Sequence, residues 1–258
     1  RIMSKDLIST DEYIKIKKKR KRIKKIVVLF IFLISILVTL CLKIPYFNIE
    51  SIEIKGNVNI PKEVIKDSST IKTGNNIFYT NKKDAIENIS LNPYIEEVKI
   101  TKKLPNKLEI YVKEREALFY NKVDKDFFII SKNGCVLEKR KEIKNMKLIN
   151  LQGFEFNESK IGSALKAKDE RAVKILNDFG VLLKNNTSDV IFTQLDLRNL
   201  LDIKIYDNGI CVKIGTSDQI EKKLNTAINI LKRDELKKAK KGYVDVSYEG
   251  NPVFYIEK

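Results

Sequence analysis

The sequence predicts an α+β protein in which one membrane helix precedes a small mixed domain and a larger β-rich domain with two helices. The first supporting observation is a single uncharged, apolar run near the N-terminal end of the chain. The second is a series of short segments beyond residue 50 in which apolar residues recur at every second position, as in half-buried strands. The third is a pair of amphipathic helical patterns among the later segments.

The uncharged run is Ile26–Leu42, which contains neither Pro nor Gly. As a helix it spans about 25 Å, close to a hydrocarbon core of about 30 Å. Lys24, Lys25 and Lys43 flank it, and their long side chains can reach the headgroups. A soluble core helix usually has a polar stripe, and this run has none. A signal peptide is the other alternative, but the run is longer than a signal core and lacks a small-x-small cleavage site. We therefore predict a single-pass anchor over 26–44.

The basic segment 1–25 sets the predicted orientation. It holds eleven Lys or Arg and three acidic residues, and no comparable block follows the anchor. The positive-inside rule then places this tail in the cytoplasm and the rest of the chain outside, a type II arrangement. We expect the tail to be mobile and able to bind anionic lipid headgroups. It lacks interleaved aromatic residues, so we expect no nucleic-acid partner.

Composition argues against an enzyme. The 258-residue chain has a net charge of +16, three cysteines and no histidine. Without histidine, the Ser-His-Asp and Cys-His mechanisms and the commonest zinc ligand are excluded. Gly-rich phosphate loops are also absent, so no cofactor or metal is expected. Cys135 and Cys211 lie at apolar strands beside Asn-Gly turns, and we expect them to be unpaired.

Residues 45–116 predict a β-α-α-β-β domain. An aromatic pair at 46–47 suits the membrane interface. The strands are expected at 50–55, 97–101 and 107–113, with the first and third as the sheet edges. Pro61 opens one helix and Asn81 caps a second, which ends before Pro93. Both helices should cover one face.

This region carries a resemblance to a known family. The passage LNPYIEEVKITKKLPNKLEIYVKEREALF, residues 91–119, resembles the POTRA domain of the bacterial FtsQ/DivIB division proteins. The similar features are Pro93-Tyr94-Ile95, the basic stretch ending at Pro105, the alternating strand after it, and Glu114-Arg115. The family often has Pro after that last pair, whereas this chain has Glu116-Ala117.

Residues 117–258 resemble the β domain of the same family. The pattern predicts a hairpin over 127–137, a helix over 168–184, and strands near 191–198, 203–205 and 210–214, the last two joined by Asn208-Gly209. A second helix should start with a capping box at Asp218 and end among lysines 237–241 before Gly242. Two further strands, 243–248 and 253–256, are expected to close the chain.

The resemblance implies a non-enzymatic scaffold of the division machinery at the septum, which binds FtsB/DivIC-like and FtsL-like proteins through exposed strand edges. The partner-binding residues implied on the matching positions are Tyr248, Val253, Phe254 and Tyr255. The alternative is that these side chains only complete the sheet core, because alternation places Phe254 and Tyr255 on opposite faces.

Two other functions remain open at this point. POTRA domains also serve membrane transport and assembly systems, which would require a long downstream series of alternating strands. A membrane-anchored cell-wall hydrolase would use carboxylates, and Asp196, Asp202 and Asp207 lie near predicted strands. Acidic residues beside turns are more often solvated caps.

Overall fold

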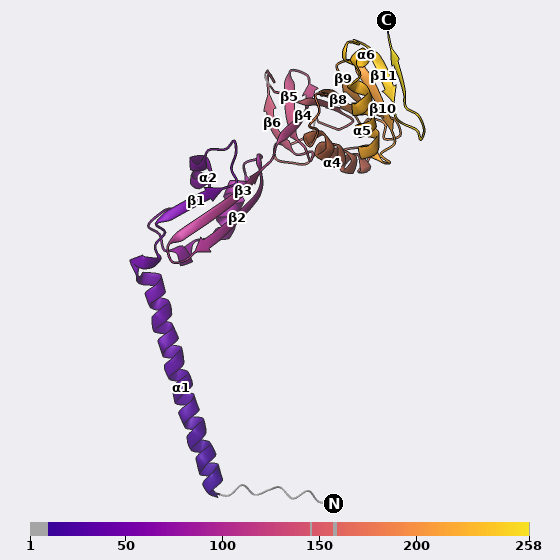
Figure 1. Cartoon of the computed structure of the whole chain (residues 1–258). Coiled ribbons are helices and arrows are strands. Elements are labelled where there is room, and N and C mark those ends of the chain that lie inside the picture. The colour runs from indigo at the N-terminus through magenta and orange to yellow at the C-terminus, as the bar shows by residue number, and fades with distance from the viewer. Residues whose placement is uncertain (1–9, 145, 157–158, 258) are drawn as a thin grey trace, which may run out of the picture.

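The computed structural model describes residues 10–144, 146–156 and 159–257. Helix α1 (Thr10–Lys43) is one continuous helix that projects away from two β-sheets (Figure 1). Its Lys17–Lys43 portion is long and apolar enough to cross a membrane, by length and composition. Within it, the Thr39 hydroxyl donates to the Ser35 carbonyl at 2.8 Å, so that polar side chain is satisfied by its own helix.

Residues 10–25 of the basic tail continue the same helix. This stretch contains neither Gly nor Pro and is rich in Lys and Arg, which favour helices. The mobility expected of the tail stays a prediction. Residues 1–9 lie outside the described part of the chain.

The first sheet has three strands in the order β1-β3-β2, with β1 parallel to β3 and β2 antiparallel to it. The prediction that the third strand is an edge is therefore wrong. The β2–β3 hairpin leaves one side of β3 free, and β1 occupies that side, so the edges are β1 and β2. The elements are η1 (Pro45–Phe47), β1 (Ser51–Lys55), α2 (Lys62–Ser68), η2 (Ile77–Tyr79), α3 (Lys82–Ser90), β2 (Ile95–Lys103) and β3 (Lys107–Glu114).

Both helices of this domain cover one face of the sheet, as predicted. Ile65 of α2 and Ile89 of α3 share one core with Ile54, Ile110 and Ile100 from the three strands. The predicted cap at α3 is confirmed, because the Asn81 side chain accepts from the backbone N–H groups of residues 83 and 84. Burial of the apolar face, at about 25 cal/mol per Å², is what holds so small a sheet together.

The second sheet has nine strands in the order β12-β11-β10-β9-β8-β7-β4-β5-β6. Parallel pairing occurs between β10 and β11, β4 and β7, and β7 and β8, and the other pairs are antiparallel. The strands are β4 (Ala117–Val123), β5 (Asp126–Ser131), β6 (Val136–Arg140), β7 (Ile149–Gln152), β8 (Phe192–Asp196), β9 (Ile203–Asp207), β10 (Ile210–Gly215), β11 (Gly242–Asp245) and β12 (Val253–Ile256).

Helices α4 (Arg171–Lys184) and α5 (Ile220–Leu231) pack on one face of this sheet. The apolar stripes predicted for them are buried, including Phe179 of α4 and Leu224 of α5. A short third helix, α6 (Asp234–Lys237), follows. The mixed fold predicted from the sequence, with an apolar N-terminal helix and a β-rich second domain, is confirmed.

Three details around α5 differ from prediction. The helix begins at Ile220 rather than with an Asp218 cap, because the Asp218 carboxylate accepts from the Thr216 hydroxyl at 3.0 Å and Gln219 is left-handed. The lysines at 237–241 lie at the end of α6 and after it rather than at the end of α5, since the extended backbone of Arg233 separates the two helices. Gly242 begins β11 instead of serving as a helix stop.

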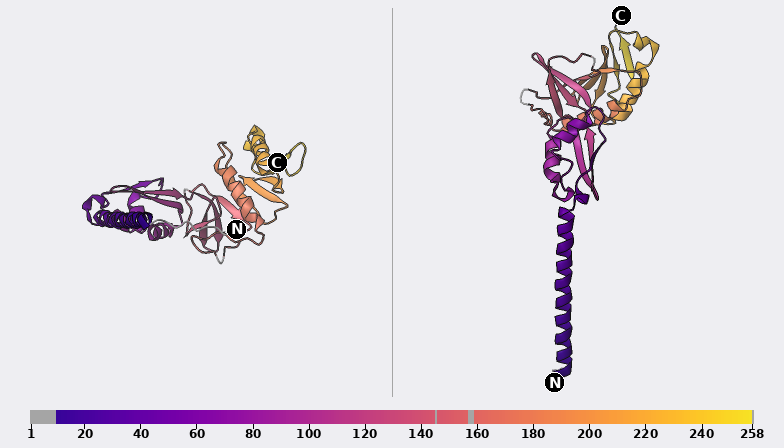
Figure 2. Two further views of the ribbon diagram at one scale, coloured as in Figure 1. Left: turned by 90° about the horizontal axis from the view of Figure 1, so that it is seen from below. Right: turned by 90° about the vertical axis from the view of Figure 1, so that its left-hand side faces the viewer.

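The two sheets are joined through polar contacts. The Tyr94 hydroxyl donates to the Glu138 carboxylate at 2.8 Å, and burial raises the pKa of Tyr94. In the connection between the sheets, Arg115 donates to the carbonyls of Pro93, at 2.8 Å, and Ile95, which ties this connection to the first domain. In both figures the C-terminal strand lies at the opposite end of the molecule from α1 (Figures 1 and 2).

Candidate partner-binding site

The last strand, β12, forms one edge of the nine-stranded sheet. It pairs with β11 in the register Gly242↔Ile256 to Asp245↔Val253. The N–H of Glu257 donates to Lys241 at 3.1 Å. Antiparallel hydrogen bonds alternate along a strand, so the backbone groups of Phe254 and Ile256 point to the outer side. Within the described residues no strand pairs there, and the free N–H and C=O groups can accept another strand.

The side chains of β12 divide between two faces. Val253 and Tyr255 are about half exposed, at 46% and 54%. Phe254 and Ile256 pack against the core under the helices, and the Arg233 guanidinium lies 5.6 Å from the Phe254 ring. The opposite orientation of Phe254 and Tyr255 expected from alternation is thus observed. Phe254 secures the strand, whereas Tyr255 is presented outward.

A row of aromatic side chains continues from Tyr255 across the uncovered face. The pairing register places Tyr255 beside Tyr243, Tyr243 beside Cys211, and Cys211 beside Tyr206. The Tyr255 and Tyr243 rings stack at 5.7 Å, and the Lys213 ammonium lies 4.4 Å from the Tyr243 ring. Tyr243 and Tyr206 were not predicted as site residues, because their alignment depends on the register between strands. Alternation within each strand is the sequence signal that could have indicated their face.

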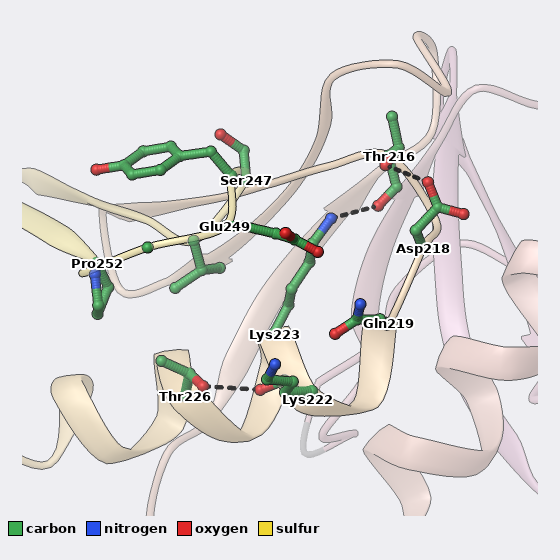
Figure 3. Close-up of a pocket in the computed structure, with 12 residues that line it drawn as sticks. Thr216, Asp218, Gln219, Lys222, Lys223, Thr226, Ser247, Glu249 and Pro252 are labelled. Carbon is green, nitrogen blue, oxygen red and sulfur yellow. Dashed lines mark hydrogen bonds between the residues drawn. The ribbon is translucent and has the colours of Figure 1, made fainter.

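Tyr248 lies in the connection between β11 and β12, apart from the strand residues. It is 49% exposed, and its hydroxyl donates to the Asn251 carbonyl at 3.3 Å. Together with Glu249 and Pro252 it lines a groove of about 420 Å³ against the start of α5. Figure 3 shows Lys222 and Lys223 on the helix side of this groove and Glu249 on the opposite side. The groove therefore offers charges of both signs beside the free edge.

The other edge of the sheet, β6, differs from β12. A loop covers its start: the Val136 N–H donates to Ser163 at 2.9 Å, and the Gly162 N–H donates to Val136 at 2.7 Å. Cys135 also forms an isolated bridge with Ala164. Of the two edges, β12 is the one whose outer side is open along the strand.

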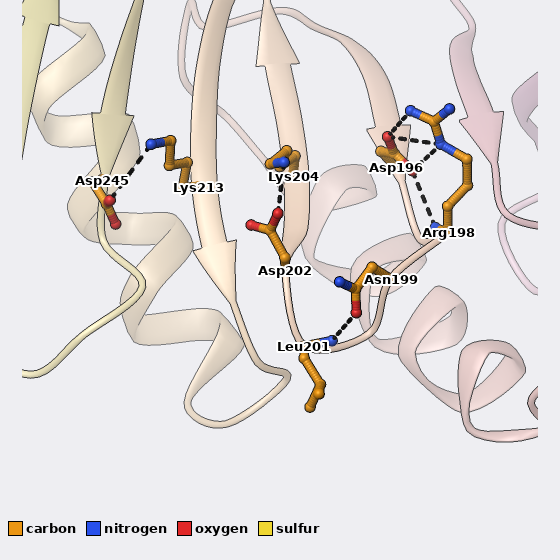
Figure 4. Close-up of polar contacts among 8 residues, drawn as sticks. All are labelled: Asp196, Arg198, Asn199, Leu201, Asp202, Lys204, Lys213 and Asp245. Atoms are coloured by element: carbon orange, nitrogen blue, oxygen red, sulfur yellow. Dashed lines mark hydrogen bonds and ion pairs between the residues drawn. The ribbon is translucent and has the colours of Figure 1, made fainter.

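The three acids considered for catalysis do not converge on one another. Asp196 pairs with Arg198 at 2.5 Å, and that guanidinium lowers the pKa of Asp196. Asp202 pairs with Lys204 at 2.6 Å, as Figure 4 shows. Burial raises the pKa of Asp207, and the charge of Asp189 adds to this effect. The first two carboxylates are thus paired with cations in structural ion pairs.

Within the described ranges no group of three or more Cys, Asp or Glu side chains could hold a metal ion.

Two parts of the chain match known protein families. Residues 47–115 match the FtsQ-type POTRA domain, and residues 119–247 match the C-terminal region of the cell division proteins FtsQ and DivIB. The chain belongs to the FtsQ/DivIB family.

Individual relatives within the FtsQ/DivIB family agree. Cell division protein DivIB of Clostridium botulinum is 99% identical over 99% of this chain and 100% of its own length. DivIB of Clostridium acetobutylicum is 45% identical over 87% of this chain and 89% of its own. FtsQ of Rickettsia bellii is 26% identical over 82% of this chain and 73% of its own. All are named as division proteins.

The family match over the β domain ends at residue 247, immediately before Tyr248 and β12. The candidate site therefore rests on the position of β12 in the sheet.

The lysines expected to flank the anchor lie on α1: Lys24 and Lys25 precede the apolar run, and Lys43 is the last residue of the helix. All three are exposed. Cys135 and Cys211 are free thiols, as expected.

Proposed function

We propose that this FtsQ/DivIB family protein is a non-enzymatic, single-pass scaffold that captures other division proteins at the free edge of β12. The partners implied by the family resemblance are FtsB/DivIC-like and FtsL-like proteins. The observation that carries the proposal is the position of β12: it ends a nine-stranded sheet, and its outer side is unpaired in the described residues. Strand addition there would supply backbone hydrogen bonds, and side-chain pockets would supply specificity.

Four residues form the proposed partner-binding surface, namely Tyr248, Val253, Phe254 and Tyr255. Val253 and Tyr255 contact the partner directly, because they are exposed on one face of the strand. Phe254 holds the strand against the core, so its contribution is to position the edge. Tyr248 lies at the groove beside α5, where a side chain or turn of the partner would fit.

The proposed arrangement in the cell follows from α1 and its flanks. The basic tail 1–25 lies in the cytoplasm, residues 26–44 span the membrane, and two domains, 45–116 and 117–258, lie outside at the septum. The basic residues before the anchor contact anionic headgroups, at about 1 kcal/mol for each well-placed side chain. The distance between α1 and β12 along the molecule supports this arrangement, because it would hold the capture site away from the bilayer (Figure 1).

The direct test is deletion of residues 253–258 from the full chain. The truncated protein should remain in the membrane fraction but fail to retain a co-produced FtsB/DivIC-like partner in a pull-down from solubilised membranes. Tyr111→Ala, an exposed change on the first sheet, is the matched control and should retain capture. If the truncated chain still captures the partner, β12 is not part of the interface.

A further inference from the structure

Hydrogen bonds hold the C-terminal end of α1 directly against the POTRA domain. The Asn76 amide donates to the carbonyls of Cys41, at 3.0 Å, and Leu42, at 3.2 Å. These carbonyls lie in the last turn of a helix, where backbone acceptors lack partners within the helix. The Asn76 oxygen accepts from the Phe78 N–H at 2.9 Å, which fixes the orientation of the amide. A buried side chain of the domain thus caps the membrane helix.

The same end of the domain exposes several apolar side chains. Tyr46, Tyr79 and Leu104 are 63%, 68% and 61% exposed, and Phe78 is 38% exposed. We call these four residues the membrane-facing end. They come from three separate segments: η1, η2 and the turn between β2 and β3. Exposed large apolar groups gathered from several segments are a sign of an interaction surface.

Contacts between the segments show that they lie together beside the end of α1. The Phe47 ring is 5.3 Å from the ring of Phe78, which joins η1 to η2. The Lys102 ammonium donates to the Phe78 carbonyl at 3.4 Å, which brings the end of β2 to η2. The Glu50 N–H donates to Asn106 at 2.8 Å, so the β2–β3 turn lies beside the residues that follow η1.

Lysines accompany these apolar groups. Lys43 ends α1, Lys82 follows Tyr79 by three residues, and Lys103 precedes Leu104. Lys72 lines a hollow of about 420 Å³ together with Tyr79. Burial lowers the pKa of Lys102, and the charge of Lys82 lowers it further. Aromatic rings with lysines around them are the composition that suits the headgroup layer of a bilayer.

We propose that the membrane-facing end of the POTRA domain sits in the phospholipid headgroup layer of the leaflet from which α1 emerges. The proposal rests on the membrane-spanning role of α1 stated above. The occupant is the bilayer because this surface is continuous with the end of the anchor: Asn76 holds the domain on the last turn of α1, so Tyr79 and Leu104 cannot move far from the membrane. The lysines then face lipid phosphates. The anchor and the domain form one rigid unit whose orientation the bilayer fixes.

The chain contains no tryptophan, which permits a direct test. Single variants Tyr79→Trp and Leu104→Trp are made in the full chain and reconstituted in nanodiscs of phosphatidylcholine with phosphatidylglycerol. Lipids brominated near the headgroup should quench both tryptophans, and their emission should shift to shorter wavelength. Leu201→Trp, 73% exposed in the second domain, is the control and should be neither quenched nor shifted.

Two further measurements fix the role of the lysines and the identity of the occupant. Replacing Lys82 and Lys103 by Glu should reduce the quenching of both tryptophans. Unquenched tryptophans at 79 and 104 in protein that remains in the nanodisc would overturn the proposal. So would an emission shift that arises only when partner proteins are added, because that would assign the surface to a protein. The quenching experiment uses nanodiscs without any partner protein. Its result is therefore independent of whether β12 captures a partner.

Discussion

The ring of Tyr255 on the edge strand stacks on the ring of Tyr243 in the neighbouring strand, with centroids 5.7 Å apart and planes inclined by 29°. This contact lies on the sheet face opposite the core, where no helix packs in the described part of the chain. It holds a four-residue strand flat against β11 while one face of Tyr255 stays exposed. Without it, the backbone pairing with β11 and the packing of Phe254 and Ile256 would have to hold so short a strand.

Replacement of Tyr255 by Ala should weaken both the edge strand and partner capture. Loss of an aromatic pair costs about 0.5–1.5 kcal/mol beyond the area it buries, so we expect β12 to fray and capture to decline. Tyr255→Phe keeps the ring and should retain most of the capture. Amide hydrogen exchange of β12 and a pull-down with the proposed FtsB/DivIC-like partner measure the two effects. Equal capture by the Ala variant would exclude Tyr255 from the interface.

Replacement of Ile256 by Pro should block strand addition while leaving β12 in place. The register and the Glu257–Lys241 bond place the Ile256 N–H on the outer side, so proline removes a donor that the native sheet does not use. Proline also fills the outer side with its ring. We expect loss of partner capture with the other strands unaffected, measured by pull-down and by circular dichroism.

The matched control for that change is Ile256→Ala. It removes the same packing against the core but keeps the N–H, so it should retain capture at reduced stability. If both variants capture the partner equally well, the backbone edge of β12 does not mediate binding.

Replacement of Glu114 by Gln should destabilise the POTRA domain in a pH-dependent way. The Glu114 carboxylate accepts from the backbone N–H groups of Val58, Asn59 and Ile60 at 2.7–3.1 Å. Burial alone would raise the pKa of Glu114, but these hydrogen bonds outweigh it and lower the pKa. Hydrogen bonds to a charged group are worth more than neutral ones, and we expect a loss of about 1 kcal/mol for this partly exposed group.

The sign of the pH effect follows from the lowered pKa. The stabilisation is complete above the unfolded-state pKa of Glu, about 4.3, and is lost as pH falls through the folded-state value. The difference in the free energy of unfolding between wild type and Glu114→Gln should therefore be constant near neutral pH and shrink in acid. Denaturant unfolding at several pH values measures it. A difference that grows in acid would contradict the assigned hydrogen bonds.

Replacement of Gly180 by Ala should destabilise the second domain. A Cβ at this position of α4 would lie 2.1 Å from the Lys132 carbonyl oxygen, so the helix must shift from the β5–β6 turn. Overpacking of this kind costs about 1–3 kcal/mol, which outweighs the gain of up to about 1 kcal/mol in helix propensity. Val181→Ala, an exposed change one residue later, should have little effect. Thermal unfolding compares the two, and a more stable Gly180→Ala variant would contradict the close approach.

Much of the fold was predictable because local patterns and the native contacts agree. The apolar stripe of α4, the Asn81 cap and the Asn208-Gly209 turn between β9 and β10 were all predicted from spacing alone. The turn residues both have positive φ, at 44° and 96°, as that dipeptide favours. The edge position of β12 was expected because this strand is the last predicted strand of the sequence, and the sheet order confirms it.

The failures occur where long-range pairing decides the structure. Strand β4 was missed because the buried Asn121 interrupts its apolar pattern, and its amide is satisfied by the Leu151 carbonyl at 2.6 Å. The central position of β3 depends on its parallel pairing with β1, which the sequence order does not reveal. At the site, the stacking of Tyr243 on Tyr255 depends on strand register, and the cap that Asn76 provides to α1 joins residues more than thirty positions apart.

Replacement of residues 26–40 by an unrelated apolar helix of equal length should leave partner capture partly intact. The run 26–42 contains neither Gly nor Ala, so the close helix pairing that small residues permit is not built into it. The contacts that hold the POTRA domain go to the backbone carbonyls of Cys41 and Leu42, which the exchange retains. Pull-down from solubilised membranes measures capture, with the membrane fraction as the control for insertion. Complete loss of capture by a correctly inserted chimaera would show that side chains of α1 contact partner helices, and the role of α1 would then extend beyond anchoring.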